Sequence, residues 1–310
     1  MKRNALVRII FFSLLILVLL SVLLIGLGVE LFTFRADYDT EHSSLGSGTV
    51  PAESVRNIAI EWAAGSITIQ EADTDQITFQ ESSVKNVESM VYRQTGDQLT
   101  IQYQKSKVHL GFPPILGKYL TITVPMDWYC DELQIKAADA NLTINNFSAS
   151  EVSMDSASGD CQFTNCDIQK LDVDCASGEI VYSGTLQFLD CESASGDVTA
   201  MLLNVPKSID LDSASADLDL TLPADAGFCV EIDSISGDFS TDFNVSRHDD
   251  RIICGDGVCN INVDGVSGDV NIRKHEQSIH HVHDTNCYTQ GSTCPDISST
   301  ESNHHADDHH

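Results

Sequence analysis

Carboxylates recur at regular places in the second half of the chain. Six segments between residues 150 and 273 have the form apolar-x-apolar-acid, then small residues and a glycine corner, then a second acid. The acids after the corner are Asp160, Glu179, Asp197, Asp217, Asp238 and Asp269. The acids before the corner are Asp155, Asp174, Glu192, Asp212, Asp233 and Asp264. Repeated oxygen ligands of this kind could bind a hard divalent cation, of which Ca²⁺ is the first to consider.

The corners recur at a nearly constant spacing. They stand at residues 159, 178, 196, 216, 237 and 268, so the steps are 19, 18, 20, 21 and 31 residues. A period near 20 residues is typical of one coil of a β-helix or β-roll. Apolar and polar residues alternate on both sides of each corner, as in half-buried strands, and glycine accepts the positive φ of a tight turn. The pattern predicts an all-β repeat solenoid.

Coils that stack in register would place equivalent residues in columns. The predicted core columns are Met154, Val173, Cys191, Leu211, Ile232 and Val263 before the corner, and Cys161, Ile180, Val198, Leu218, Phe239 and Val270 after it. The carboxylates would form two further columns, with neighbouring coils about 4.8 Å apart. At that distance two unit charges repel by about 1 kcal/mol in water.

Two interpretations of the acidic columns stay open. In one, the carboxylates are solvated corner residues that accept hydrogen bonds from backbone N–H groups, which is the usual role of aspartate in turns. In the other, the acids after the corner bind Ca²⁺ weakly, because a cation would relieve the repulsion. The period-nine glycine and aspartate pattern of calcium-binding rolls is absent from the sequence.

A second candidate metal site lies in the C-terminal tail, residues 274–310. The tail is polar and rich in histidine. Its candidate ligands for Zn²⁺ or Ni²⁺ are His280, His281, His283, His304, His305, His309 and His310. Histidine-rich tracts bind transition metals as a class. The alternative is a plain disordered tail without a metal.

The N-terminus has the pattern of a membrane anchor. Residues 1–8 carry Lys2, Arg3 and Arg8, and residues 9–29 form an uncharged apolar run of the length that crosses a bilayer. The basic flank predicts a cytoplasmic N-terminus and an extracellular C-terminal bulk, a single-pass protein of the cell membrane. A cleaved signal peptide is the alternative, but the bulky exit at residues 29–34 lacks the small residues of a cleavage site.

Beyond the anchor we expect a linker over residues 30–54, the solenoid over residues 55–273 and the tail over residues 274–310. Short alternating stretches at 58–62, 65–69, 76–80, 98–103 and 120–125 predict strands in the first half of the solenoid. The formal net charge of −29 argues against nucleic acid as a partner. It favours divalent cations, cationic peptides and basic protein surfaces.

The chain has ten cysteines. This even, high number suits an oxidising exterior, where disulfides form. Local pairs are Cys161 with Cys166, Cys254 with Cys259, and Cys287 with Cys294. The alternative is that several cysteines are small buried apolar residues, and the sequence does not decide between the two.

The repeated corners behind one apolar span resemble those of the bacterial "putative adhesin" β-strand-repeat family, a cell-envelope domain of unknown function. The resemblance covers roughly residues 55–273, and the stretches at 120–125 and 133–144 look like the entry into that family's repeats. It implies a surface β-solenoid, adhesion by name, and a part in envelope-stress sensing in some relatives. It implies no catalytic residues. The cysteines and the histidine-rich tail depart from the family pattern.

We therefore expect a membrane-anchored, adhesin-like surface interaction protein without catalytic activity, with a cell-wall polymer, a cationic peptide or a protein as its partner. The alternative is an envelope-stress sensor or regulatory module. A glycan-active β-helix enzyme is a weaker alternative, because paired carboxylates can serve as acid and base on a sugar. Lys170 and Lys207 are the only Lys or Arg residues between positions 137 and 246, however, so neutralising an acidic glycan is hard to arrange.

Overall fold

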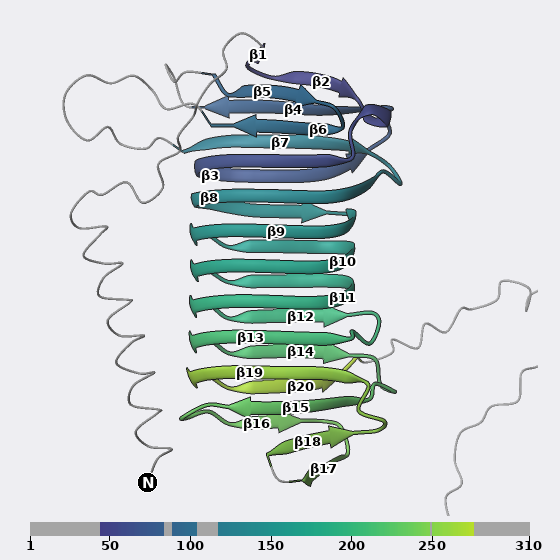
Figure 1. The fold of residues 1–310 in the computed structure, drawn as a ribbon, viewed down its shortest axis with the longest axis vertical. Coiled ribbons are helices and arrows are strands. Elements are labelled where there is room, and N and C mark those ends of the chain that lie inside the picture. The colour runs from purple at the N-terminus through teal and green to yellow at the C-terminus, as the bar shows by residue number, and fades with distance from the viewer. Residues whose placement is uncertain (1–43, 84–88, 104–116, 249, 276–310) are drawn as a thin grey trace, which may run out of the picture. The chain divides into compact units, whose positions relative to one another are not determined.

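The computed structural model describes residues 44–83, 89–103, 117–248 and 250–275. These residues form a 20-stranded sheet system with one short 3-10 turn, Ala52–Ser54 (Figure 1). The strands of the first half are β1 (Ser44–Leu45), β2 (Gly48–Pro51), β3 (Asn57–Ala72), β4 (Gln76–Ser83), β5 (Val91–Thr95), β6 (Gln98–Gln102), β7 (Lys118–Pro125), β8 (Tyr129–Asn145), β9 (Ser148–Ser158) and β10 (Cys161–Ser177). Those of the second half are β11 (Ile180–Ser195), β12 (Val198–Leu202), β13 (Ser208–Ser215), β14 (Leu218–Leu222), β15 (Phe228–Asp233), β16 (Phe239–Thr241), β17 (Val245–His248), β18 (Arg251–Cys254), β19 (Cys259–Ser267) and β20 (Val270–Lys274).

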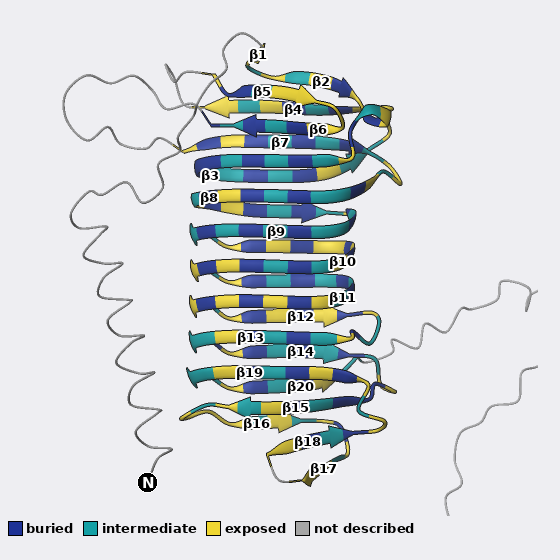
Figure 2. Cartoon of the chain, viewed as in Figure 1, coloured by how far each residue is buried: buried dark blue, intermediate teal, exposed yellow. Residues whose placement is uncertain are grey.

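The coils stack as parallel strands in register, as the repeat predicts. Val173 pairs with Met154 on one side and with Cys191 on the other, and Ile180 pairs with Cys161 and Val198. Residues that alternate with these core positions are exposed or intermediate in burial (Figure 2). The all-β solenoid predicted from the period is therefore confirmed for the described residues.

Glycine at the corner is required by its surroundings as well as by its turn. Gly159 has φ +124°, and a Cβ atom there would lie 2.2 Å from the carbonyl oxygen of Ala140 in the adjoining coil. Gly178 has φ +140°, and its Cβ would lie 2.3 Å from the oxygen of Gly159. A side chain at either of these two positions would therefore force the coils apart. The prediction that glycine makes the corner is confirmed.

The stacking order differs from the chain order at the C-terminal end. β19 and β20 pair with β13 and β14 on one side and with β15 and β16 on the other. The coil of residues 259–274 therefore lies between the coils of residues 208–222 and 228–241. The reason is the hairpin β17–β18 within the long 31-residue step: β18 pairs antiparallel with Phe228–Glu231 and occupies the outer edge of β15, so the last coil takes the inner edge. The order of the last two coils in space is therefore the reverse of their order in the chain.

A similar inversion occurs at the N-terminal end, where β3 lies between β8 and the coil formed by β6 and β7. Antiparallel strands cover this end, since β2 pairs with β4, β4 with β7, and β5 with β1 and β6. Val50 and Ala52 are buried, so the folded unit begins within the stretch expected to be linker. Beneath this cover lies a buried ion pair, in which Lys118 Nζ is 2.7 Å from Glu81 Oε1.

The eight described cysteines are free thiols, and most are buried. Cys254 and Cys259 pair with Phe228 from opposite sides, which places them two strand spacings apart, about 10 Å. A disulfide needs Cα atoms within about 7 Å, so this local pair cannot close. Burial raises the pKa of the Cys130 and Cys161 thiols to about 12. These cysteines are core residues, while Cys287 and Cys294 lie outside the described residues.

No helix within the described ranges is long and apolar enough to cross a membrane. The anchor expected at residues 9–29 lies outside those ranges.

Candidate interaction surface

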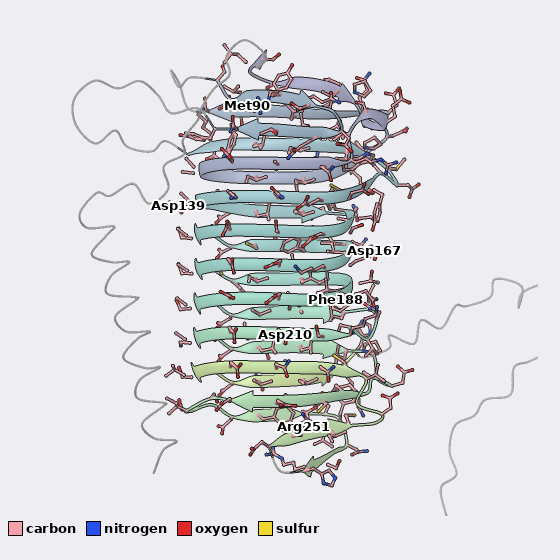
Figure 3. All side chains as sticks on the ribbon, viewed as in Figure 1. Met90, Asp139, Asp167, Phe188, Asp210 and Arg251 are labelled. Atoms are coloured by element: carbon pink, nitrogen blue, oxygen red, sulfur yellow. The ribbon has the colours of Figure 1, made fainter. Side chains whose placement is uncertain are left out.

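The strands that precede the corners carry two parallel columns of carboxylates on their outer side. The column next to the corner runs in space through Asp155, Asp174, Glu192, Asp212, Asp264 and Asp233. Two residues earlier on the same strands, a second column runs through Asp172, Asp190, Asp210, Asn262 and Glu231. We call these two columns the acidic face; Asp210, labelled in Figure 3, lies on it.

Basic residues accompany the acidic face mainly at its ends. Lys136 stands in line with Asp155, 3.9 Å away, and Lys170 Nζ lies 3.0 Å from both Asp172 and Glu151. At the other end Arg251 pairs with Glu231 at 2.6 Å. In the middle coils the carboxylates face one another, with an amide, that of Asn262, donating to Asp210 Oδ1 at 2.6 Å.

The crowding raises the pKa of several carboxyl groups. Partial burial, followed by repulsion from Asp155, Asp172 and Asp190, raises the pKa of Asp174. Repulsion from Asp174 is the largest cause of the raised pKa of Glu192. The pKa values of Asp190 and Asp264 are raised by partial burial and then by neighbouring acids. The folded chain therefore holds these groups in a field that a cationic ligand would relieve.

The acids after the corner also form a column, which we call the corner column. Its order in space is Asp160, Glu179, Asp197, Asp217, Asp269 and Asp238. Asp197 Oδ1 accepts the N–H of Asp217 at 3.0 Å, and Asp217 Oδ1 accepts the N–H of Asp269 at 2.7 Å. At the head of the column Asn141 plays the same part for Asp160 at 3.0 Å.

These hydrogen bonds are the arrangement expected of solvated corner residues. Each accepted N–H uses one carboxylate oxygen and leaves the other toward solvent. Within the described ranges no group of three or more His, Cys, Asp or Glu side chains is arranged to hold a metal ion. Calcium binding by the corner column stays a prediction. The histidines proposed for Zn²⁺ or Ni²⁺ all lie outside the described residues.

The opposite side of the solenoid is nearly neutral. The outward residues after the corner form a row of Thr68, Thr143, Gln162, Val181, Thr199, Asp219, Asn271 and Ser240. Its one acid, Asp219, has Arg273 at 3.6 Å. The negative charge of the coils is thus concentrated on one side and along one edge.

Sequence reasoning missed the column of Asp172, Asp190, Asp210 and Glu231. The signal was present, since each of these acids stands two residues before an acid already singled out. Residues two apart on a strand share a face. The two columns together, rather than either alone, make a continuous acidic surface.

The family of the chain follows from its repeats. A model of the Toastrack DUF4097 family matches residues 55–187 and again residues 131–273, which together span most of the solenoid. The chain belongs to the Toastrack DUF4097 family. The resemblance to cell-envelope β-strand repeats is confirmed by this match, and the Toastrack coils are the part of the chain that carries the acidic face.

Solved structures with a similar fold include a "putative adhesin" from Bacteroides fragilis, with 15% identity over 75% of this chain and 97% of that chain, and a TM-score of 0.41. A "putative cell adhesion protein" from Clostridium sporogenes has 9% identity over 75% of this chain and 100% of that chain, with a TM-score of 0.33. A "putative lipid binding protein" from Parabacteroides distasonis has 10% identity over 76% and 97%, with a TM-score of 0.32. No curated protein matches the chain.

Proposed function

We propose that this Toastrack protein is a membrane-anchored surface interaction protein whose acidic face binds a basic peptide or a basic protein surface. The observation that carries the proposal is the pair of adjoining carboxylate columns, which are poor in basic partners at their centre. Partial burial and repulsion from neighbouring acids raise the pKa values of Asp174, Asp190 and Asp264 in these columns, and repulsion from Asp174 raises that of Glu192. Charge complementarity of this kind steers encounter and sets specificity. The function is binding, without a catalytic step.

The uncharged run of residues 9–29 behind a basic flank supports the anchor and its orientation. With the N-terminus in the cytoplasm, the acidic face would be displayed outside the cell, where basic partners meet it. Protease treatment of intact cells should then remove the acidic repeats while a cytosolic marker survives. If the repeats were protected together with the cytosolic marker, the proposed orientation would be wrong.

The binding proposal is tested with the full chain in detergent and a fluorescent oligolysine peptide. The triple variant Asp190→Asn/Glu192→Gln/Asp212→Asn removes the centre of the acidic face. We expect its affinity to fall at least about tenfold at low salt, because close charge pairs dominate such encounters. The matched control, Asp73→Asn/Asp75→Asn/Asp225→Asn, removes the same charge from exposed sites elsewhere and should stay within about twofold. Equal losses in the two variants would mean that net charge, not the acidic face, attracts the peptide.

A further inference from the structure

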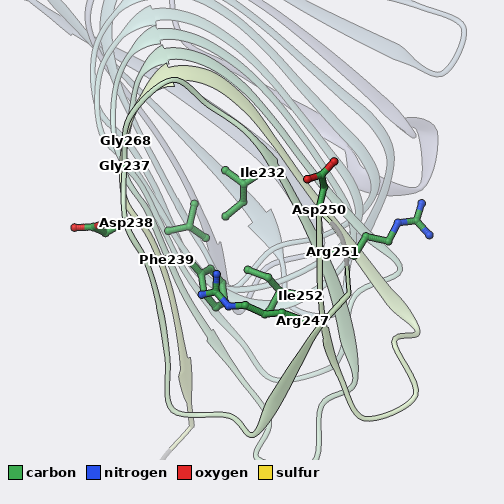
Figure 4. A pocket seen from close by; sticks show the side chains of 10 residues that line it. Ile232, Gly237, Asp238, Phe239, Arg247, Asp250, Arg251, Ile252 and Gly268 are labelled. Carbon is green, nitrogen blue, oxygen red and sulfur yellow. The ribbon is translucent and has the colours of Figure 1, made fainter.

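The two ends of the solenoid are covered to different degrees. Antiparallel strands extend over the first coil, whereas at the other end β18 covers only Phe228–Glu231 of β15. Beyond that point, from Ile232 through the corner to the end of β16, no described strand pairs with the outer edge of the last coil. Figure 4 shows this end, with the hairpin turned away from the corner.

The uncovered part exposes the floor of the core. Ile232 and Phe239 are only half-buried, although they continue columns in which Val173 and Leu218 are 0% exposed. Ile235, at the corner of this coil, is 60% exposed. A cavity of about 390 Å³ opens here between the last coil and the hairpin, and the Arg247 guanidinium lies 5.8 Å from the Phe239 ring (Figure 4).

The backbone of the last coil is set to accept another strand. In the internal coils, Val198 N–H donates to Asp217 O and Val270 N–H donates to Asp238 O, each at 2.9 Å. Phe239 holds the same place in the last coil, so its N–H points to the uncovered edge. Asp238 likewise holds the place from which Asp217 accepts the N–H of the next coil. The last coil therefore offers the same N–H donor, carboxylate acceptor and apolar surface with which each of the internal coils binds its neighbour.

We propose that this end of the solenoid binds an extended segment of a partner protein, which adds to β15 and β16 as one further coil. The segment would place alternate apolar residues on Ile232 and Phe239, and it would carry Lys or Arg between them. Main-chain hydrogen bonds supply affinity in this mode of recognition, and the alternate side chains supply specificity. Arg247 swings off Phe239 to admit the segment.

The charge around this end favours a basic segment over a second copy of the chain or the chain's own tail. The exposed acids around the end are Glu231, Asp233, Asp238, Asp242 and Asp250, against the bases Arg247 and Arg251. A second copy docked end to end would bring two such negative rims together. The chain's own tail after residue 275 has six carboxylates and no Lys or Arg, so it is repelled in the same way. A basic segment is attracted.

This site adjoins the acidic face at Glu231 and Asp233 but lies away from its centre at Asp190, Glu192 and Asp212, and its test separates the two. The protein is the full chain in detergent, and the probes are two labelled peptides with the sequence of residues 260–273. One keeps the natural sequence, which represents a coil from a second copy; the other carries Asp264→Lys and Asp269→Lys. A scrambled form of the basic peptide keeps its charge and loses its alternation. We expect the basic peptide to bind most tightly and the natural and scrambled peptides to bind at least about tenfold more weakly, because the first lacks the charge and the second lacks the alternation.

Variants then locate the site. Phe239→Glu should lower binding of the basic peptide to the level of the scrambled peptide, because it places a charge on the apolar floor. Ile235→Glu, at a side chain that is already exposed, should weaken binding without a risk to folding. Met201→Glu, at a residue 42% exposed on the side of an internal coil, is the control and should change binding by less than about twofold.

Three results would overturn the proposal. One is tighter binding of the natural peptide than of the basic one, or self-association in sedimentation that Phe239→Glu removes, since both indicate a second copy. Another is unchanged binding in both Phe239→Glu and Ile235→Glu. The third is a loss in Asp190→Asn/Glu192→Gln/Asp212→Asn as large as that in Phe239→Glu, which would transfer the peptide to the acidic face.

Discussion

At the scale of single residues, the corner column shows how like charges are tolerated between closely stacked coils. The Asp217 carboxylate accepts the N–H of Asp269 at 2.7 Å, so its side chain caps a backbone donor at the corner. Repulsion along the column is the cost of this arrangement. Asn141 makes the same bond to Asp160 without a charge, which shows that an amide oxygen suffices.

Replacement of Asp217 should separate these two effects. Asp217→Asn keeps the acceptor and removes the charge, so it should leave the free energy of unfolding unchanged or raise it slightly. Asp217→Ala removes the acceptor as well and should lower that free energy by about 1 kcal/mol. Urea unfolding of the full chain followed by circular dichroism measures both. A larger loss in the asparagine variant than in the alanine variant would mean that the carboxylate charge itself is needed, as in a cation site.

At the scale of the elements, the alternation within each coil decides which side chains form the core. Val198 is buried in the column after the corner, and Thr199 beside it points outward. Val198→Asp should therefore cost about 3 kcal/mol or more of stability, since it buries an unpaired charge. Thr199→Asp should cost less than about 1 kcal/mol, mostly through repulsion from Asp219. Equal effects of the two changes would contradict the register.

The order of the coils gives a sharper prediction. Asp212 pairs with Asp264, and Asp233 lies one coil further on. A double-mutant cycle with Asp212→Asn and Asp264→Asn should show a coupling of about 0.5 kcal/mol, because the two acids stand on neighbouring strands. The cycle with Asp233→Asn should show almost none, because the separation doubles and salt screens the pair. A larger coupling between Asp212 and Asp233 than between Asp212 and Asp264 would mean that the coils stack in chain order.

The sequence is informative about what repeats and weak where the repeat is interrupted. Columns such as Met154, Val173 and Cys191 follow from alternation and period, because a coil pairs with whatever shares its pattern. Because coils with the same pattern can pair with one another, the sequence does not show which of the last two coils lies next to residues 208–222. The segments around Ile232 and Val263 fit that position equally well. The hairpin edge at Phe228–Glu231 decides between them. The cover strand Gly48–Pro51 was missed because it is short and has a single buried apolar residue, Val50, before a proline.

The candidate site was predicted in part. The repeat predicts the corner column and the acids next to the corner. Asp190 and Asp210 were recognised as part of the site only from the strand register, which places them on the same face as Glu192 and Asp212. No pattern in the sequence reveals that the Lys118–Glu81 pair is buried, because charged residues are normally exposed. The uncovered end at Phe239 likewise depends on where the hairpin turns.

At the scale of the whole molecule, the acidic face should make stability depend on pH. The pKa values of Asp174, Asp190, Glu192 and Asp264 are raised in the folded state. The folded chain therefore binds protons more readily than the unfolded chain, and the destabilisation by these groups is lost as pH falls through the raised values. As the pH falls from 7 towards the ordinary carboxyl pKa values of 3.8 for Asp and 4.5 for Glu, the Tm should rise by a few degrees. Asp190→Asn/Glu192→Gln/Asp212→Asn should flatten that rise, and a steady fall of Tm over this range would contradict the account.

If the acidic face is the surface on which a basic partner docks, its carboxylates lie against the amines of a bound basic peptide. Zero-length carbodiimide coupling of a lysine-rich peptide to the full chain, followed by mass spectrometry, reports which carboxylates lie against the peptide amines. We expect coupling to be concentrated at Asp174, Asp190, Glu192, Asp210 and Asp212, with little at Asp73, Asp97 or Asp225. Coupling spread evenly over the exposed carboxylates, or concentrated away from the two columns, would contradict binding at the acidic face.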